Sequence, residues 1–413
     1  MKLWVRATLL TVIVAIGAST VGCNGAASGK PSGNEGASGG DANEFKVGIS
    51  VSYTGPNAQN GLEAINGLNM ALDYINENDG FNGGKAVLAT LYDTKGSTEE
   101  AVKSAQKFIQ NENVNAVIAS QVSAEVLAAG RYYDEAGIFT IAMGTSPSVM
   151  QKGWKHIIRG SVNYDFVVPE VVSCINDMEI SKIAVMKDQS EAALTFAQAF
   201  EEKAKEQGIE ILISESCEPE DTDLSAQCAR IIAADPQAVF ISMTSNDCGY
   251  FVKQIRQYGY DGIIFDKESF FASMVGIAGA ENSNYIIFAN PYVTYEKIED
   301  CTIDNMRAFL EEYQERFGQL PTTEIAYRAY DSAMVIWEAS KIAGSNEAEA
   351  MLAAVPKIKI EGLGGTMDYS NNDGEPYHTV RRFIYVDGVN MDWNEWMESG
   401  GYLKYKETTK NEY

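Results

Sequence analysis

The chain has 413 residues, 45% of them hydrophobic, which is enough for two ordinary domains with real cores and argues against global disorder. Its formal net charge of -25 weighs against nucleic acid and anionic membrane surfaces as partners, because both attract basic protein surface. The sequence holds no GxGxxG, Walker or HExxH motif and no CxxC pair, so we expect neither a cofactor nor a metal site.

From Glu44 onward, apolar runs of strand length alternate with helical patterns. In the first half, strands are expected at Phe45–Val51, Ala86–Tyr92, Ala116–Ala119 and Ile138–Ile141. Helical spacing occurs over Leu62–Ile75 and Ser97–Ile109, after Ser123 and after Ser146. Ser97 with Glu100 three residues later is a capping-box signature, so the helix is expected to begin there.

The same rhythm continues after about Tyr164. Strands are expected at Lys182–Met186, Ile209–Ser214, Ala238–Met243, Gly262–Phe265 and Tyr285–Phe288, with a helical pattern after each of the first four. Two longer helical patterns follow, over 303–317 and 324–343, and then two strands, 366–369 and 379–386, around a turn at 371–374. The tail after Met397 is mostly polar and is expected to be partly loose.

Alternating strands and helices predict parallel sheets that are covered on both faces. We therefore expect an α/β chain with two doubly wound halves, one from Glu44 to about Asn163 and one from about Tyr164 to Phe288.

Two polar loops follow neighbouring strands of the first half, at 120–123 and at Gly144-Thr145-Ser146-Pro147. In a parallel sheet both loops lie at the carboxyl ends of the strands, where open α/β folds bind ligands. Ser123 and Ser146 stand where helices should begin. They could be plain N-caps, or they could offer hydroxyl and backbone N–H groups to a ligand, and the two interpretations are compatible. Gly144 would let a ligand approach the backbone.

The first residues are typical of a processed segment rather than of a fold. Basic residues precede an apolar run over 9–16 that is too short to span a membrane, and Thr20-Val21-Gly22-Cys23 follows. This end resembles a bacterial lipobox, which predicts a signal peptide over 1–22 and a lipidated Cys23. An ordinary secretory signal is the alternative. Residues 23–43 then predict a Gly/Ser-rich tether behind the lipid.

The five other cysteines leave two possibilities open. Buried free thiols are favoured, and a bridge between Cys217 and Cys228 is the alternative. The cysteines concerned are Cys174, Cys217, Cys228, Cys248 and Cys301.

Motifs spread over most of the chain resemble the periplasmic-binding-protein family of branched-chain amino-acid ABC importers, the leucine/isoleucine/valine-binding type. The most specific is the run Asp223–Gln227 followed by Ala234–Pro236. The other matching positions are 54–56 with Gly61, 92–93, 100–102, Ser123, 144–146, Arg159 and 277–279.

The resemblance implies two lobes joined by three crossover strands, which close on a ligand like a hinge. Lobe one would comprise 44–163 and 290–374, and lobe two would comprise 164–289 and 375–413.

The resemblance also implies the roles of the site residues. The loop at Ser123 would hold the ligand carboxylate. The Gly144 carbonyl and the Ser146 hydroxyl would accept from the ligand ammonium, with Thr145 between them. A carboxylate from lobe two would complete the ammonium site, and alignment on the strand at 263–265 gives Glu268, with Asp266 as the fallback.

Two departures from the family pattern fall where ligand side chains are usually met. Asn60 replaces a frequent aromatic residue, and Gln189-Ser190-Glu191 replaces a frequent Tyr-Gly pair. Asn60, Gln189 and Ser190, together with Asn246, are therefore candidate ligand contacts. A small amino acid or a related carboxylate is a better expectation than leucine.

The function implied is that of an extracytoplasmic solute-binding lipoprotein on the cell membrane, anchored there by its lipid only, which delivers an amino acid to ABC permease subunits. A ligand sensor of the same fold, acting through a signalling partner, is the alternative. An enzyme is not expected, because the chain has only two histidines and no credible nucleophile motif. His156, which precedes the apolar pair at 157–158, is expected to be structural.

Overall fold

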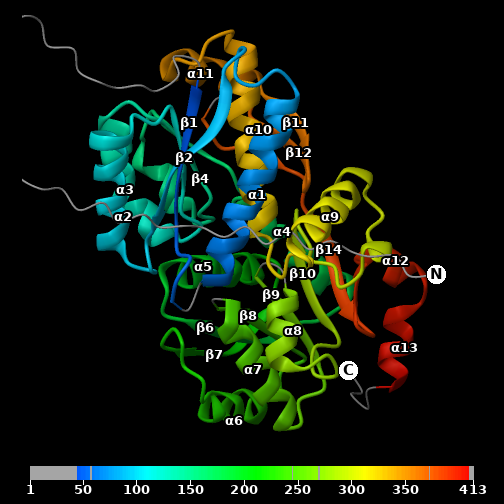
Figure 1. Cartoon of the computed structure of the whole chain (residues 1–413). Coiled ribbons are helices and arrows are strands. Elements are labelled where there is room, and N and C mark those ends of the chain that lie inside the picture. The colour runs from blue at the N-terminus through cyan, green and yellow to red at the C-terminus, as the bar shows by residue number, and fades with distance from the viewer. Residues whose placement is uncertain (1–43, 56–57, 244, 268–269, 372, 409–413) are drawn as a thin grey trace, which may run out of the picture. The chain divides into compact units, whose positions relative to one another are not determined.

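A computed structural model of the chain describes residues 44–408, apart from 56–57, 244, 268–269 and 372. The expected signal peptide, Cys23 and the tether lie outside the described residues. The described strands form two large sheets and one small sheet (Figure 1). None of the helices in these residues combines the length and the apolar character needed to cross a membrane.

The first large sheet is parallel throughout, with the strand order β2-β1-β3-β4-β5. Its strands are β1 (Glu44–Val51), β2 (Lys85–Asp93), β3 (Ala116–Ala119), β4 (Phe139–Ala142) and β5 (Ile157–Arg159). Every residue of β3 and β4 is buried, as is expected of central strands that are covered on both faces.

Helices cover both faces of this sheet. Ala116 and Ile118 of β3 face one core, which they share with two long helices, and Val117 and Ala119 face the other. The helical elements here are α1 (Ala58–Glu77), α2 (Thr98–Lys107), the π-helical turn η1 (Phe108–Glu112), α3 (Ser123–Glu135), the 3-10 turn η2 (Pro147–Lys152) and, from later in the chain, α10 (Ile325–Ala343) and α11 (Ala348–Ala354). Figure 1 shows α1 beside α10, and α2 beside α3.

The second large sheet has the order β15-β14-β10-β9-β8-β6-β7. The segment from β10 to β7 is parallel, and β14 and β15 extend it as antiparallel strands. Its strands are β6 (Lys182–Asp188), β7 (Glu210–Cys217), β8 (Ala238–Ser242), β9 (Ile263–Asp266), β10 (Ile286–Asn290), β14 (Arg381–Val386) and β15 (Val389–Asp392).

Helix α4 (Tyr164–Asp177) precedes the first of these strands. The helices that follow β6, β7, β8 and β9 are α5 (Glu191–Glu206), α6 (Ser225–Ala233), α7 (Ser245–Gln257) and α8 (Ala272–Ala278). Alternate residues of β6 again face two different cores. Later elements are η3 (Ile298–Asp300), α9 (Asp304–Phe317), η4 (Val355–Lys357), α12 (Trp393–Glu398), α13 (Gly401–Thr408) and a small sheet of β11 (Lys359–Gly362), β12 (Gly365–Asp368) and β13 (Tyr377–His378).

The expected alternation of strands and helices is confirmed, and the differences are local. The tail is not loose as far as Thr408, because α13 buries Tyr405, and the Tyr402 hydroxyl donates to the Met178 carbonyl at 2.6 Å. The two strands expected around 371–374 do not pair with each other. Strand β12 pairs with β11 and with the short β13, and β14 joins the second large sheet. Leu62, expected on the apolar face of α1, is 47% exposed.

The cysteines of the described residues are free and buried, so Cys217 and Cys228 are not bridged. Burial raises the pKa of both thiols to about 12, which makes them poor nucleophiles at neutral pH. The lobe boundaries at 163, 290 and 374 stay predictions.

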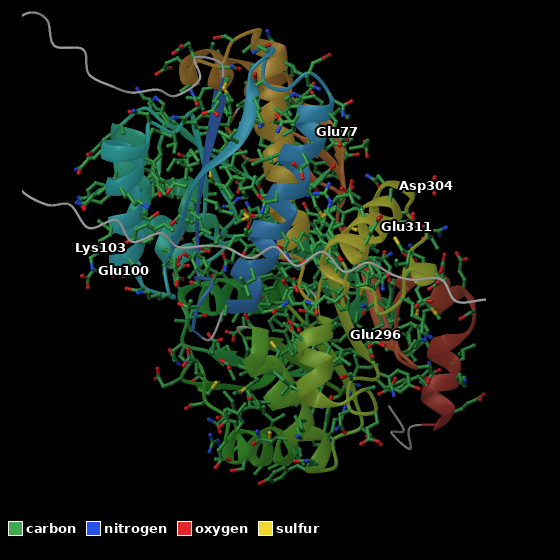
Figure 2. The ribbon with its side chains drawn as sticks, in the orientation of Figure 1. Glu77, Glu100, Lys103, Glu296, Asp304 and Glu311 are labelled. Atoms are coloured by element: carbon green, nitrogen blue, oxygen red, sulfur yellow. The ribbon has the colours of Figure 1, made fainter. Side chains whose placement is uncertain are left out.

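Some acidic residues lie on solvated faces of the helices. Glu77, Asp304 and Glu311 are exposed on their helices (Figure 2). On α2, Lys103 bridges Glu99 and Glu100 at 2.8 Å each, and exposed pairs of this kind contribute little stability.

Candidate functional site

A cavity of about 180 Å³ lies where strands of both large sheets end, and it is lined from both sides. Small-molecule pockets usually enclose roughly 300–1,000 Å³, so this one suits a small ligand. Of the expected contact residues, four line it: Asn60, Ser123, Thr145 and Ser190.

The other expected residues are placed differently. Gly144 and Ser146 are buried behind the wall and touch Ser123. Gln189 is exposed in the loop after β6 and is not part of the lining. Glu268 and the side chain of Asn246 lie outside the described residues.

Ser123 does not cap α3. The helix begins at Ser123 itself, and the N-cap position belongs to Val122, whose aliphatic side chain cannot accept from the first turn. The N–H groups of that turn have no partner within the helix, and Ser123 and Ala124 both border the cavity. Since the Ser123 hydroxyl oxygen accepts from the Ser146 N–H at 3.2 Å, its own O–H can still donate to a ligand.

Ser146 is an N-cap, as one interpretation of the sequence predicted. Its hydroxyl oxygen accepts from the Ser148 N–H at 3.4 Å, and Pro147 takes the first helical position of η2. The same hydroxyl donates to Glu191 across the cavity edge at 2.8 Å.

Gly144 makes room for the protein rather than for a ligand. A Cβ on this residue would lie 3.0 Å from the Ser123 Oγ and 3.1 Å from its Cα. The absence of a side chain therefore lets the loops after β3 and β4 meet. The Gly144 carbonyl accepts from the Arg159 guanidinium and from the Ser161 hydroxyl, the latter at 3.1 Å.

Arg159 at the end of β5 anchors this loop. The residue is fully buried, and its Nη2 donates to the Ser146 carbonyl at 2.8 Å while its Nε donates to Glu375 at 2.5 Å. Burial lowers the pKa of this guanidinium, and Glu375 opposes that effect. Because one side chain holds the Gly144 and Ser146 carbonyls together, the loop is fixed before any ligand arrives.

The wall contributed by the second sheet carries two charged groups. Glu191 opens α5, and its Oε1 accepts from the Ser146 and Ser148 hydroxyls at 2.8 and 2.7 Å. Its Oε2 is buried and has no hydrogen-bond partner among the described residues. Lys267 directly follows β9 and is only 7% exposed, and its Nζ lies 5.9 Å from the centre of the Tyr164 ring.

The first turns of α10 add an ion pair to the lining. Glu324 and Arg328 are buried and bonded to each other, and the Arg328 Nη1 donates to the Met143 carbonyl at 3.3 Å. Lys267 and Arg328 were not predicted as lining residues. A lysine two residues after the apolar run Ile263–Phe265 was a usable signal for the first, whereas nothing in the helical pattern marks the second.

Four of the described helices begin at the cavity. Their first residues are Ser123, Tyr164, Glu191 and Ile325, and all four line it. Each helix N-terminus carries a partial positive charge, so their convergence favours a ligand with an anionic group. Asn163 and Ser190 already cap α4 and α5, whereas no side chain among the described residues caps α3 or α10.

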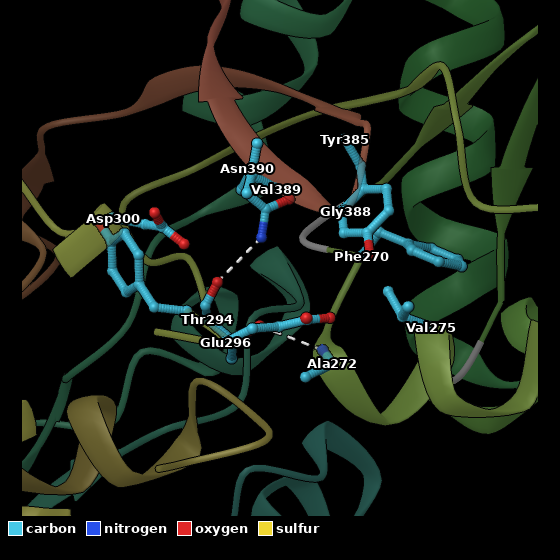
Figure 3. A pocket seen from close by; sticks show the side chains of 11 residues that line it. Phe270, Ala272, Val275, Thr294, Glu296, Asp300, Tyr385, Gly388, Val389 and Asn390 are labelled. Atoms are coloured by element: carbon cyan, nitrogen blue, oxygen red, sulfur yellow. Dashed lines mark hydrogen bonds between the residues drawn. The ribbon is translucent and has the colours of Figure 1, made fainter. Parts of the chain in front are cut away.

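Another hollow of the described surface fits a ligand less well. This hollow, beside Thr294 and Asn390 (Figure 3), encloses only about 10 Å³, roughly the room of one water. Two hydrogen bonds already join polar groups of its lining. Asn390 donates to the Thr294 carbonyl at 2.9 Å, and the Ala272 N–H donates to the Thr294 hydroxyl at 3.1 Å. Within the described residues, no group of side chains is arranged to hold a metal ion.

Comparison with known proteins identifies the architecture. The family described as periplasmic binding protein matches residues 44–388. A Leu/Ile/Val-binding protein homolog 7 of Brucella abortus (strain 2308) is 24% identical over 348 residues, which cover 80% of this chain and 87% of that protein.

Solved structures show the same fold. The branched-chain amino acid transporter substrate binding protein LivJ of Streptococcus pneumoniae, in complex with isoleucine, superposes with a TM-score of 0.74 at 23% identity, covering 84% of this chain and 97% of that one. A solute binding protein of an ABC transporter from R. palustris, in complex with benzoate, has a TM-score of 0.74 at 15% identity, covering 85% and 95%. One fold thus holds an amino acid in one protein and an aromatic carboxylate in the other.

Proposed function

Because the chain belongs to the periplasmic-binding-protein family, we propose that it is the solute-binding lipoprotein of an ABC importer, which captures a small amino acid or a related carboxylate and delivers it to permease subunits. The observation that carries the proposal is the cavity itself. Its lining offers helix N-termini, which attract an anionic group, and a carboxylate, which attracts a cationic group. These groups come from elements of two different sheets.

The ligand carboxylate would bind at Ser123 and the first turn of α3. There the hydroxyl and the backbone N–H groups donate, and the helix dipole adds to the attraction. An N-cap without an acceptor of its own supports this placement, since a ligand oxygen then takes the place of a capping side chain.

The ligand ammonium would bind near Ser146 and a carboxylate of lobe two. Glu191 lines the cavity with a buried oxygen for which the described residues offer no partner, and Glu268 is the carboxylate that the family alignment gives. A buried ammonium needs such a partner, because an unpaired charge is costly to desolvate. The Gly144 carbonyl contributes less than the resemblance implied, because Arg159 and Ser161 already bind it.

Lipid on Cys23 would keep the protein at the membrane, near the permease that it serves. The expected result is a lipid-modified N-terminus in mass spectra of the mature protein, together with loss of the Cys23→Ser protein from the membrane fraction. If the Cys23→Ser variant fractionated with membranes as the wild type does, the anchoring proposal would be wrong.

A thermal-shift screen with amino acids and small carboxylates tests the binding function. A ligand at about 100 times its Kd stabilises the folded state by roughly 2.7 kcal/mol, which raises the Tm measurably. We expect at least one small amino acid or carboxylate to do so. If none raises the Tm at millimolar concentration, the cavity is not a site for this class.

A further inference from the structure

The cavity carries more polar groups than an aliphatic amino acid needs. Besides Glu191, which would serve the ligand ammonium, Lys267 brings a cation to the wall formed by the second sheet. Glu324 and Arg328 form an ion pair within one helix, so they largely satisfy each other. A hydrocarbon side chain placed against such a wall would strip water from charged groups and give nothing in return.

Gln121 points the same way from the opposite wall. It lines the cavity in the loop after β3, and both its amide oxygen and its amide nitrogen are buried without a hydrogen-bond partner among the described residues. A buried amide that lacks partners is costly unless something bonds to it, so this side chain favours a ligand with more than one polar group.

Lys267 is held in a defined place. Its Nζ lies over the Tyr164 ring, and the Tyr164 hydroxyl accepts from the Thr145 hydroxyl at 2.5 Å. All three residues belong to the cavity lining. The Lys267 ammonium group thus lies at a cavity where four helix N-termini also favour a negatively charged ligand group.

Building on the proposed function, we infer that the ligand is a small amino acid with a second carboxylate, and that Lys267 pairs with that second carboxylate. The α-carboxylate binds at the start of α3, the ammonium binds the lobe-two carboxylate, and the side-chain carboxylate binds Lys267. Each charge of such a ligand then faces a group of opposite sign in the cavity lining.

The wild-type protein tests this inference by itself. Calorimetric titration of the mature chain compares glutamate with glutamine and aspartate with asparagine, because the members of each pair share size and differ in charge. We expect the acidic member of at least one pair to bind about tenfold more tightly or better, as a charge-assisted pair would require. If the amides, or leucine and isoleucine, bind as tightly as the acids or more tightly, the inference is overturned.

A variant then assigns the preference to one side chain. Lys267→Met keeps the approximate length of the side chain and removes its charge. It should therefore lower the affinity for the preferred acid about tenfold or more, and it should change the affinity for the corresponding amide less than about threefold. Lys267→Arg should retain most of the preference. Lys253→Met, an exposed lysine on α7, is the matched control and should change neither affinity.

The outcomes separate the two proposals. If Lys267→Met weakens the acid and the amide equally, Lys267 has a structural role only and the inference fails. If a neutral amino acid binds best, the inference fails while the binding function stands. If only a carboxylate without an ammonium group binds, the inference likewise fails while the binding function stands. If neither amino acids nor small carboxylates bind, both fail. Should Lys267→Met not fold, the wild-type comparison still decides.

Discussion

Among single residues, Ser123 carries the most direct prediction. Its hydroxyl would donate to the ligand carboxylate, and a hydrogen bond to a charged group is worth roughly 1.5–3 kcal/mol. Ser123→Ala should therefore weaken binding by roughly 10- to 100-fold in calorimetry.

The same substitution also removes the acceptor for the Ser146 N–H, so some loss of stability is expected. Ser97→Ala is the control for this loss of stability. Ser97 caps α2 by accepting from the Glu100 N–H at 3.4 Å. Removing this cap costs about 1 kcal/mol of stability without touching the cavity. If Ser123→Ala and Ser97→Ala bind the ligand equally tightly, Ser123 has a purely structural role.

The carboxylate that meets the ligand ammonium can be identified by two substitutions. Removing one partner of a desolvated charge pair costs on the order of 2–5 kcal/mol, or roughly 30- to several-thousand-fold in affinity. Glu268→Gln should show such a loss if the family alignment holds, and Glu191→Gln should show it if the residue that lines the cavity is the partner. A loss below about threefold in both variants would mean that the ligand brings no buried ammonium.

At the level of elements, a buried acid joins the segments that connect the two sheets. Asp331 on α10 accepts from the Leu363 N–H at 2.9 Å and from the Tyr292 hydroxyl at 2.8 Å, and that hydroxyl lies 3.3 Å from the His378 Nε2 in β13. Burial raises the pKa of Asp331 to about 6. Burial lowers the pKa of His378 to about 3.

These two shifts act on stability with opposite signs. Between pH 4 and 6 the folded protein keeps a proton on Asp331 that the unfolded chain releases, so this group makes stability fall as pH rises. Over the same range the unfolded chain binds a proton at His378 that the folded protein does not bind, so this group makes stability rise with pH. Together they nearly cancel.

Asp331→Asn should remove one of the two opposing effects. Relative to the wild type, its unfolding free energy should rise with pH between 4 and 6, by at most about 1.4 kcal/mol per pH unit for one proton. Urea unfolding at several pH values measures this, with Asp304→Asn, an exposed acid on α9, as the control. Parallel pH profiles for Asp331→Asn and the wild type would contradict the assignment.

At the scale of the whole molecule, the prediction is closure on the ligand. The cavity takes residues from loops after strands of both sheets, so a ligand bound to both walls stabilises the arrangement in which they are near each other. Solution scattering should give a smaller radius of gyration at ligand saturation than without ligand. Ser123→Ala at the same ligand concentration should shift less, and an unchanged wild-type profile at saturation would count against closure.

The helices and strands were predictable from the sequence, because their signals are local. Apolar runs such as Ala116–Ala119 mark central strands, and Ser97 with Glu100 marks a helix start, whatever the rest of the chain does. The loops at Ser123 and Thr145 were predictable as cavity walls for a related reason, since the carboxyl ends of parallel strands share one edge of a sheet.

Which side chains meet there depends on the tertiary structure. Arg159 holds the Gly144 and Ser146 carbonyls, and Lys267 and Arg328 reach the same cavity although they are far apart in the chain. Such encounters depend on how helices pack across two sheets, which a period of 2 or 3.6 residues does not encode. The polar tail became a helix for the same reason, because its stability comes from burying Tyr405 against distant residues rather than from its own propensity.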